Sequence, residues 1–187
     1  MTRARVAMYG GSFDPPHLGH VLSVSWVLAS ADIDEVWVIP TWKHPFEKAH
    51  GASFEARVAM CELAFAQFEH AEVSTIEQTL GGTSHTLTTI ESLQHSNPDT
   101  EFRLLVGADV LPEAPKWHRW DDIVKAAPPI VIGREGYPQP EGCPITIPNV
   151  SSTDARGSLR QNDPIEGWVP RSVVDYIRAH ALYQDAT

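Results

Sequence analysis

The sequence is poor in cysteine and in basic residues, and it contains no long apolar run. Its 187 residues include only Cys61 and Cys143, whose spacing forms no metal-binding or redox motif. Cys61 falls in a helical apolar pattern, so we expect a buried free thiol rather than half of a disulfide. The 14 Lys and Arg residues against 24 Asp and Glu give a formal net charge of −10. A nucleic-acid polymer is therefore disfavoured as a partner, because it would require a basic face.

No apolar stretch reaches the roughly 18 residues of a membrane-spanning helix, and the N-terminal run is too short for a secretory signal. We therefore expect a soluble cytoplasmic protein with no membrane partner. Hydrophobic residues make up 42% and charged residues 20%, an ordinary composition for a folded domain. The length suits one domain spanning residues 1–187, without repeats or linkers. The oligomeric state stays open, a homo-oligomer included.

The segment GGSFDPPHLGH, residues 10–20, is the most informative part of the chain. It joins an apolar run to a helical pattern, and its two leading glycines allow a ligand to approach the main chain. We expect Asp14 to cap the helix and Pro15 to occupy its first position. His17 and His20 then share one face beside a helix N-terminus that favours anions. The pattern predicts a phosphate site that carries imidazole groups.

Strand-like and helix-like patterns alternate along the chain. Apolar runs predict strands at 4–9, 35–40, 71–76, 101–106, 129–133 and 145–148. Helical periodicity predicts helices over 17–31, 53–69 and 171–180, with further helix starts near 84–86 and 151. In the first helix, the inward face is predicted to hold Leu18, Val21, Leu22, Ser25, Leu28 and Ala29. Because strand–helix–strand connections produce parallel pairing, we predict a doubly wound α/β fold with a mainly parallel sheet and helices on both faces.

Several polar segments follow predicted strands, where open α/β sheets bind ligands. Residues 41–52 carry Lys43 and Lys48. Residues 151–153 supply hydroxyl groups and free amides at a helix start, and Arg156 follows one turn later, which predicts a second anion site. In the segment 116–124, two tryptophans are spaced by three residues. We expect one in the core and the other over a ligand ring.

The segment 10–20 resembles the signature of the H-x-G-H nucleotidyltransferases, in the form found in nicotinate (nicotinamide) mononucleotide adenylyltransferases. The segments SHT (84–86), GAD (107–109), KWHRW (116–120) and SSTDAR (151–156) are similar to later motifs of that family. Three features depart from it: His85 replaces a tyrosine, Ala155 replaces an isoleucine, and residues 41–52 lack Pro-Pro-His-Lys. The resemblance implies a Rossmann-like nucleotidyltransferase fold. It also implies transfer of the adenylyl group of ATP to nicotinate mononucleotide, which gives deamido-NAD and pyrophosphate.

The resemblance also implies three groups of site residues. The catalytic group is His17, His20 and Arg156. The ATP-binding group is Gly10, Gly11, Ser12, Phe13, Gly107, Asp109, Ser151, Ser152 and Thr153. The mononucleotide-binding group is Lys48, Ser84, His85, Thr86 and Trp117, with Lys43 as the alternative to Lys48. No protein metal cage is evident, so Mg²⁺ is expected to arrive with ATP.

Two other interpretations remain. The first is an adenylyl- or cytidylyltransferase with another phosphorylated acceptor, nicotinamide mononucleotide foremost. The second is a non-catalytic nucleotide-binding regulator, which the combination of His17, His20 and Arg156 disfavours. The SHT segment and Trp117 favour a pyridine acceptor. We expect nicotinate to be preferred over nicotinamide, because helix-start N–H groups and the Thr86 hydroxyl suit a carboxylate, whereas a neutral His85 would narrow the preference.

Overall fold

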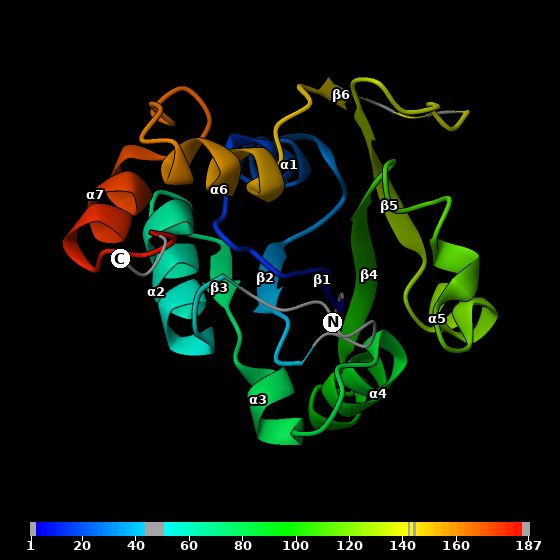
Figure 1. Ribbon diagram of the computed structural model, residues 1–187. Helices are drawn as coiled ribbons and strands as arrows, with labels where there is room; N and C mark the ends of the chain where they lie inside the picture. Colours follow the sequence, from blue (N-terminus) through cyan, green and yellow to red (C-terminus); the bar gives the residue numbers. More distant parts are fainter. Residues whose placement is uncertain (1–2, 44–50, 142, 144, 185–187) are drawn as a thin grey trace.

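The computed structural model describes residues 3–43, 51–141, 143 and 145–184. Within them the chain forms a six-stranded sheet in the order β3-β2-β1-β4-β5-β6, and every neighbouring pair is parallel (Figure 1). The strands are β1 (Ala4–Gly11), β2 (Glu35–Pro40), β3 (Ala71–Val73), β4 (Thr100–Gly107), β5 (Pro129–Arg134) and β6 (Thr146–Ile147).

Helices cover both faces of this sheet. One face packs against α1 (Leu18–Ser30), α2 (Phe54–Phe65), α6 (Ser152–Arg160) and α7 (Arg171–Ala179). The other face packs against α4 (Thr86–Ser96) and α5 (Trp120–Ala126). Two short pieces, α3 (Ile76–Leu80) and the 3₁₀ turn η1 (Ala114–Lys116), lie in connections. The predicted doubly wound α/β fold is confirmed. No helix in the described part of the chain is long and apolar enough to cross a membrane.

The central strand β1 shows why its sequence is apolar throughout. Ala7 and Tyr9 point into the core shared with α1 and α2, whereas Val6 and Met8 point into the core shared with α4 and α5. Successive side chains of a strand face opposite sides of the sheet, and here both sides are covered by helices. All four side chains are therefore buried.

The strand order reverses between β1 and β4. From β1 the chain passes through α1 to β2 on one side, while β4 pairs with β1 on the other side. In open parallel sheets, ligands bind in the crevice outside the carboxyl ends of the strands at such a reversal. Segment 10–20 leaves β1 at this point, so the fold places it in the position expected for a ligand site.

The predicted start of the first helix is wrong. Helix α1 begins at Leu18 with His17 as its N-cap, and Asp14 instead accepts hydrogen bonds from the main chain of Gly51 and Ala52. The reason lies in the two consecutive prolines at 15 and 16. Each proline disfavours helical dihedrals in the residue before it, so the helix begins only after both.

The inward face of α1 also differs from the prediction. The buried positions are Gly19, Val21, Ser23, Val24 and Val27, whereas Leu22 is 43% exposed. Small residues allow this helix to approach the sheet closely, and the buried Ser23 hydroxyl is satisfied by donating to the Gly19 carbonyl at 2.9 Å. Of the predicted inward residues Val21 is buried, whereas Leu22 points to solvent.

The third predicted strand is too long. Strand β3 ends at Val73, and the unpredicted α3 begins at Ile76. Ser74 accepts a hydrogen bond from the Ile76 amide through its side chain, a local contact that favours a turn over continued pairing. By contrast, the predicted start of the preceding helix α2 at residue 53 is confirmed, because Ser53 caps it by accepting from the Ala56 amide at 3.2 Å.

Candidate active site

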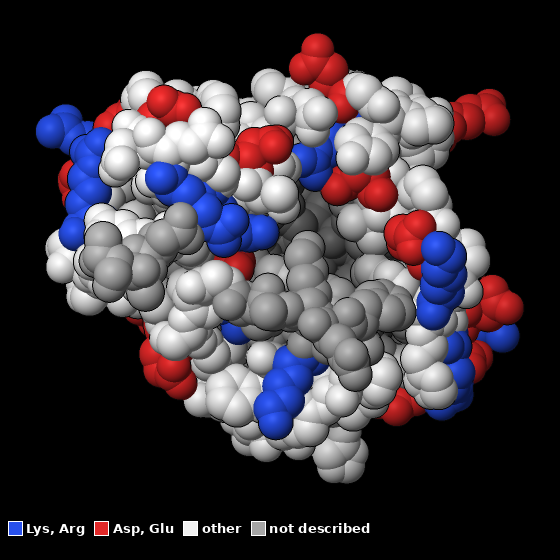
Figure 2. All heavy atoms as spheres, viewed as in Figure 1, with Lys and Arg blue, Asp and Glu red and all other residues white. Residues whose placement is uncertain are grey.

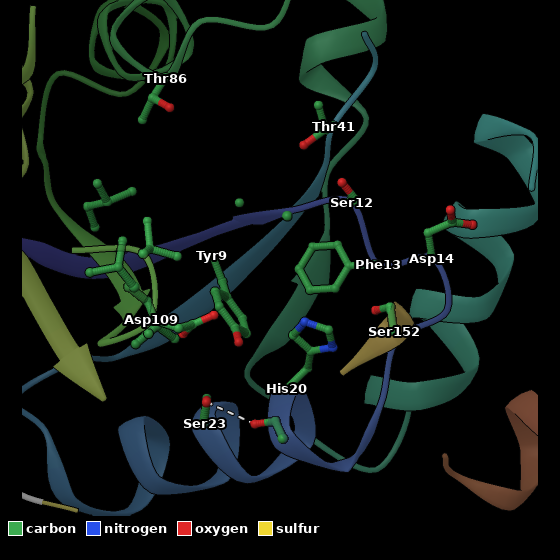
Figure 3. Close-up of a pocket in the computed structure, with 18 of the residues that line it drawn as sticks. Tyr9, Ser12, Phe13, Asp14, His20, Ser23, Thr41, Thr86, Asp109 and Ser152 are labelled. Atoms are coloured by element: carbon green, nitrogen blue, oxygen red, sulfur yellow. Dashed lines mark hydrogen bonds between the residues drawn. The ribbon is translucent and has the colours of Figure 1, made fainter. Parts of the chain in front are cut away.

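A cleft of about 890 Å³ lies at the carboxyl ends of β1 and β4. Figure 2 shows a hollow in this face of the molecule, and Figure 3 shows side chains from β1, α1 and α6 that converge on the cleft. Every site residue predicted from the sequence lines this cleft except Lys48, which lies outside the described residues. The alternative, Lys43, is exposed, and its main-chain carbonyl accepts from Ser84.

His17 and His20 form a stacked pair at the start of α1. Their ring centroids are 3.7 Å apart and their planes differ by 23°. The Nδ1 atom of His20 accepts a hydrogen bond from the His17 amide at 3.1 Å, so a neutral His20 carries its proton on Nε2. Phe13 meets the His20 ring edge-on at 4.8 Å (Figure 3). The pair is therefore held by stacking, by a main-chain donor and by an aromatic wall.

Both histidines are neutral at pH 7. Burial lowers the pKa of His17 to about 3, with a smaller contribution from the positive charge of Arg134. Burial also lowers the pKa of His20 well below its usual value, followed by the effects of His17 and Arg134. Among the described residues nothing bonds to the buried Nδ1 atom of His17. A buried nitrogen without a hydrogen-bond partner carries a free-energy cost.

The neutral state of His17 predicts a pH dependence of stability. Its folded pKa lies below the unfolded value of about 6.5, so the unfolded chain binds more protons between about pH 3 and pH 6.5. The free energy of unfolding should therefore fall as the pH decreases through this window, by up to about 1.4 kcal/mol per pH unit for this proton. Urea unfolding of the wild type and His17→Asn at about pH 5, 6 and 7 measures the slope, which should be shallower in the variant.

The exposed His95 on α4 provides the control for that experiment. His95→Asn should retain the wild-type slope. If His17→Asn also retained it, a neutral buried His17 would be contradicted.

The start of α6 forms the second wall of the cleft. The predicted helix start near 151 is confirmed, and Ser151 caps the helix by accepting from the Asp154 amide at 3.0 Å. The Ser152 hydroxyl donates to the Pro15 carbonyl at 2.8 Å. The start of α6 is therefore attached directly to the turn that precedes α1. The two helix starts predicted as separate anion sites face one cleft.

Arg156 lies one turn into α6 and is 17% exposed in its side chain. Its guanidinium donates to the Asp14 carbonyl at 2.5 Å and to the Thr153 hydroxyl at 3.3 Å. An Asp14 carboxylate oxygen lies 3.6 Å away. A guanidinium has five N–H groups, so these contacts fix its position and leave donors for a phosphate.

Arg134, at the end of β5, was not predicted as a site residue. It donates to the Asp109 carboxylate at 2.6 Å, to the Val150 carbonyl at 2.6 Å and to the Asn149 side chain at 3.2 Å. It therefore connects the turn after β4 with the chain that leads into α6. No sequence motif signals this role, because the partners lie 15 to 25 residues away.

The predicted helix start near 84–86 is confirmed, but neither Ser84 nor Thr86 caps the helix. Helix α4 begins at Thr86 with His85 as N-cap, and among the described residues no side chain caps it. The Ser84 hydroxyl instead accepts from the amides of Trp42 and Lys43, each at 3.2 Å, because it binds the chain that leaves β2. The first N–H groups of α4 are therefore available to a ligand.

Glu77 on α3 is a second cleft residue that the sequence did not reveal. It is 8% exposed and accepts from the Trp42 amide at 3.0 Å and from the Thr89 hydroxyl at 3.3 Å. Burial raises the pKa of its carboxyl group, although these hydrogen bonds and that of Ser84 act in the opposite direction. It holds the chain after β2 against α4, and it was missed because no helix was predicted directly after the strand at 71–76.

The predicted division into one core tryptophan and one ligand-facing tryptophan is only partly observed, because both tryptophans pack against the core. Trp117 and Trp120 meet edge-to-face at 5.6 Å, and both pack partly buried against the core beneath α4 and α5. Trp117 also lines the cleft. The exposed imidazoles of His85 and His118 lie 5.4 Å apart at the same end of it.

Phosphate-binding α/β proteins use helix starts beside the reversal point of a parallel sheet, and this structure falls in that class of nucleotide-binding proteins. The chain belongs to the cytidylyltransferase-like family, whose model matches residues 8–158. The predicted membership of the nucleotidyltransferases is confirmed.

Comparison with curated proteins and solved structures narrows this class. A probable nicotinate-nucleotide adenylyltransferase of Anaeromyxobacter sp. (strain K) is 40% identical over 182 residues, which cover 96% of each chain. One from Myxococcus xanthus is 37% identical and covers 96% of this chain and 94% of its own. The fold matches Plasmodium falciparum nicotinic acid mononucleotide adenylyltransferase complexed with NaAD, with a TM-score of 0.83 at 20% identity over 96% and 97% of the two chains.

Proposed function

We propose that this protein transfers the adenylyl group of ATP to nicotinate mononucleotide, giving deamido-NAD and pyrophosphate in NAD biosynthesis. The similarity to nicotinate-nucleotide adenylyltransferases over nearly the whole chain supports this function. The observation that carries it is the joined pair of helix starts. The neutral histidine pair lies on one of them and Arg156 on the other, and both face the same cleft.

The reaction needs no protein nucleophile. A phosphate oxygen of the mononucleotide attacks the α-phosphorus of ATP, and the bond from that phosphorus to the bridging β-phosphate oxygen breaks. Pyrophosphate then leaves with the bonding electron pair. Catalysis of such a transfer consists of positioning and of stabilising charge around the phosphorus.

The cleft residues fit these two tasks. His17 and His20 would donate N–H groups to phosphate oxygens without adding a proton-dependent charge near pH 7. Arg156, with the hydroxyls and amides at the start of α6, would hold the β- and γ-phosphates and stabilise the departing pyrophosphate. Residues 10–13 and the turn at 107–109 would bind the rest of ATP. The start of α4 and Trp117 would bind the pyridine.

Magnesium fits this arrangement as a companion of ATP. The Asp14 carboxylate is engaged by main-chain amides, and the Asp109 carboxylate is paired with Arg134. Within the described ranges no group of three His, Cys, Asp or Glu side chains is placed to hold a metal ion. Mg²⁺ would therefore be held chiefly by the phosphates, where it supplies charge neutralisation.

Nicotinate mononucleotide should be preferred over nicotinamide mononucleotide. A carboxylate presents only acceptors, which suits the free N–H groups at the start of α4 and the Thr86 hydroxyl. An amide would turn its own N–H₂ group toward these donors, at a cost of about 1–3 kcal/mol. We expect kcat/KM for nicotinate mononucleotide to exceed that for nicotinamide mononucleotide by roughly ten- to a hundred-fold.

Steady-state kinetics with both mononucleotides at about pH 6 and pH 8 measures this preference. His85→Gln, which removes the one titratable group at the N-cap of α4, serves as the matched variant for any pH effect. Equal kcat/KM values for the two mononucleotides, or a preference for nicotinamide mononucleotide, would contradict the nicotinate assignment. Neither result would contradict the proposed adenylyl transfer.

A further inference from the structure

The turn that follows α7 inserts Tyr183 into the interior beneath the segment 10–20. Tyr183 is 8% exposed, although the turn itself lies at the surface. Both Ala181 (φ 49°) and Tyr183 (φ 64°) adopt left-handed backbone dihedrals, which are uncommon for residues other than glycine. Such dihedrals persist where surrounding contacts enforce them.

The Tyr183 hydroxyl donates to the Asp14 carboxylate at 2.9 Å, across 169 residues of sequence. Asp14 is only 3% exposed, and its two oxygens also accept from Ala52 at 3.0 Å and from Gly51 at 2.6 Å. A buried carboxylate requires such partners, since each lost one leaves charge without compensation. Burial raises the pKa of Tyr183, as does the charge of Asp14, so the hydroxyl remains a donor.

Asp14 in turn holds Arg156. The guanidinium donates to the Asp14 main-chain carbonyl and lies 3.6 Å from its carboxylate. Packing provides a second connection: a Cβ atom on Gly51 would lie 2.9 Å from the Tyr183 ring and 3.0 Å from the Arg156 Cδ atom. A continuous chain of contacts therefore runs from the turn after α7 to the cleft, through Tyr183, Asp14 and Arg156.

We propose that Tyr183 is a positioning residue for the ATP side of the reaction, acting through Asp14 on Arg156. This inference rests on the proposed adenylyl transfer. Tyr183 would touch no reacting atom. Its hydroxyl fixes the orientation of Asp14, whose carbonyl and carboxylate set the position of the Arg156 guanidinium. A small displacement of a charged donor from the departing phosphates weakens its stabilisation of the transition state.

Tyr183→Phe tests the proposal and retains the ring that packs against Gly51. We expect kcat/KM for ATP to fall roughly tenfold, the factor that corresponds to about 1.4 kcal/mol, while the KM of the acceptor changes by less than about twofold. Tyr176→Phe is the matched control, because Tyr176 lies on α7 close to the same turn but stacks on His180 at 4.0 Å. It should retain wild-type kinetics.

Combination with Arg156→Ala separates positioning from general destabilisation. If Tyr183 acts through Arg156, Tyr183→Phe should have almost no further effect in the Arg156→Ala background. An equal loss in both backgrounds, or wild-type kinetics of a folded Tyr183→Phe, would overturn the proposal.

Should Tyr183→Phe fail to fold, Gly51→Ala, whose Cβ would press on both side chains, should produce the same ATP-side loss. Gly51→Ala with wild-type ATP kinetics would also overturn it. An inactive wild type would instead contradict adenylyl transfer itself.

Discussion

His20→Ala should lower kcat by at least roughly 100-fold, the scale of losing one preorganised transition-state donor, while the fold survives. The His20 ring stacks on His17 and is oriented by the His17 amide, so its Nε2–H group is fixed before substrate binds. Alanine removes that donor and leaves water in its place, which must be reorganised during the reaction. Steady-state kinetics at saturating ATP and nicotinate mononucleotide measures the loss, and circular dichroism checks the fold.

His70→Ala is the control for this substitution, because His70 is exposed and its main chain, not its ring, bonds to the neighbouring strand. It should turn over at the wild-type rate. A folded His20→Ala enzyme with wild-type kcat would remove His20 from the mechanism.

Arg156→Ala should reduce kcat/KM for ATP by roughly 100- to 1,000-fold and affect the KM of the acceptor far less. The guanidinium is held by Asp14 and Thr153 at the start of α6, where it is suited to the phosphates that leave. Kinetics with each substrate varied in turn separates the two effects. Arg171→Ala, at an exposed position of α7, should leave both parameters unchanged.

An unchanged response of Arg156→Ala to ATP, with only the KM of the acceptor raised, would reverse the assignment of the two phosphate subsites. A fall in kcat/KM for ATP accompanied by an equal rise in the KM of the acceptor would indicate that Arg156 supports the cleft as a whole.

The sequence predicts the architecture well because the pattern of apolar residues in each strand indicates which of its faces are buried. An apolar run such as 4–9 requires burial on both faces, and that requirement together with intervening helices specifies a parallel sheet. Segment 10–20 is equally informative, since its glycines, prolines and histidines act locally. Most cleft residues followed from such local segments, whereas Arg134 and Glu77 did not.

The features that the sequence did not reveal depend on contacts between distant segments. Asp14 appeared to be a helix cap, but its carboxylate binds residues 37 and 38 positions away and a hydroxyl 169 positions away. Arg134 has ordinary neighbours in sequence and acquires its role only when β5 lies beside β4. Helix α1 turns a different face inward, on which Gly19 and Ser23 are buried beside three valines.

Pyrophosphate release from ATP, measured with a panel of phosphorylated acceptors, tests whether this protein adenylylates nicotinate mononucleotide. The panel comprises nicotinate mononucleotide, nicotinamide mononucleotide, a sugar phosphate and a pantetheine phosphate, with ATP alone as the blank. We expect pyrophosphate release with nicotinate mononucleotide, in equal amount to a product with the mass of deamido-NAD. Release only with a non-pyridine acceptor, or with none of the panel, would contradict it.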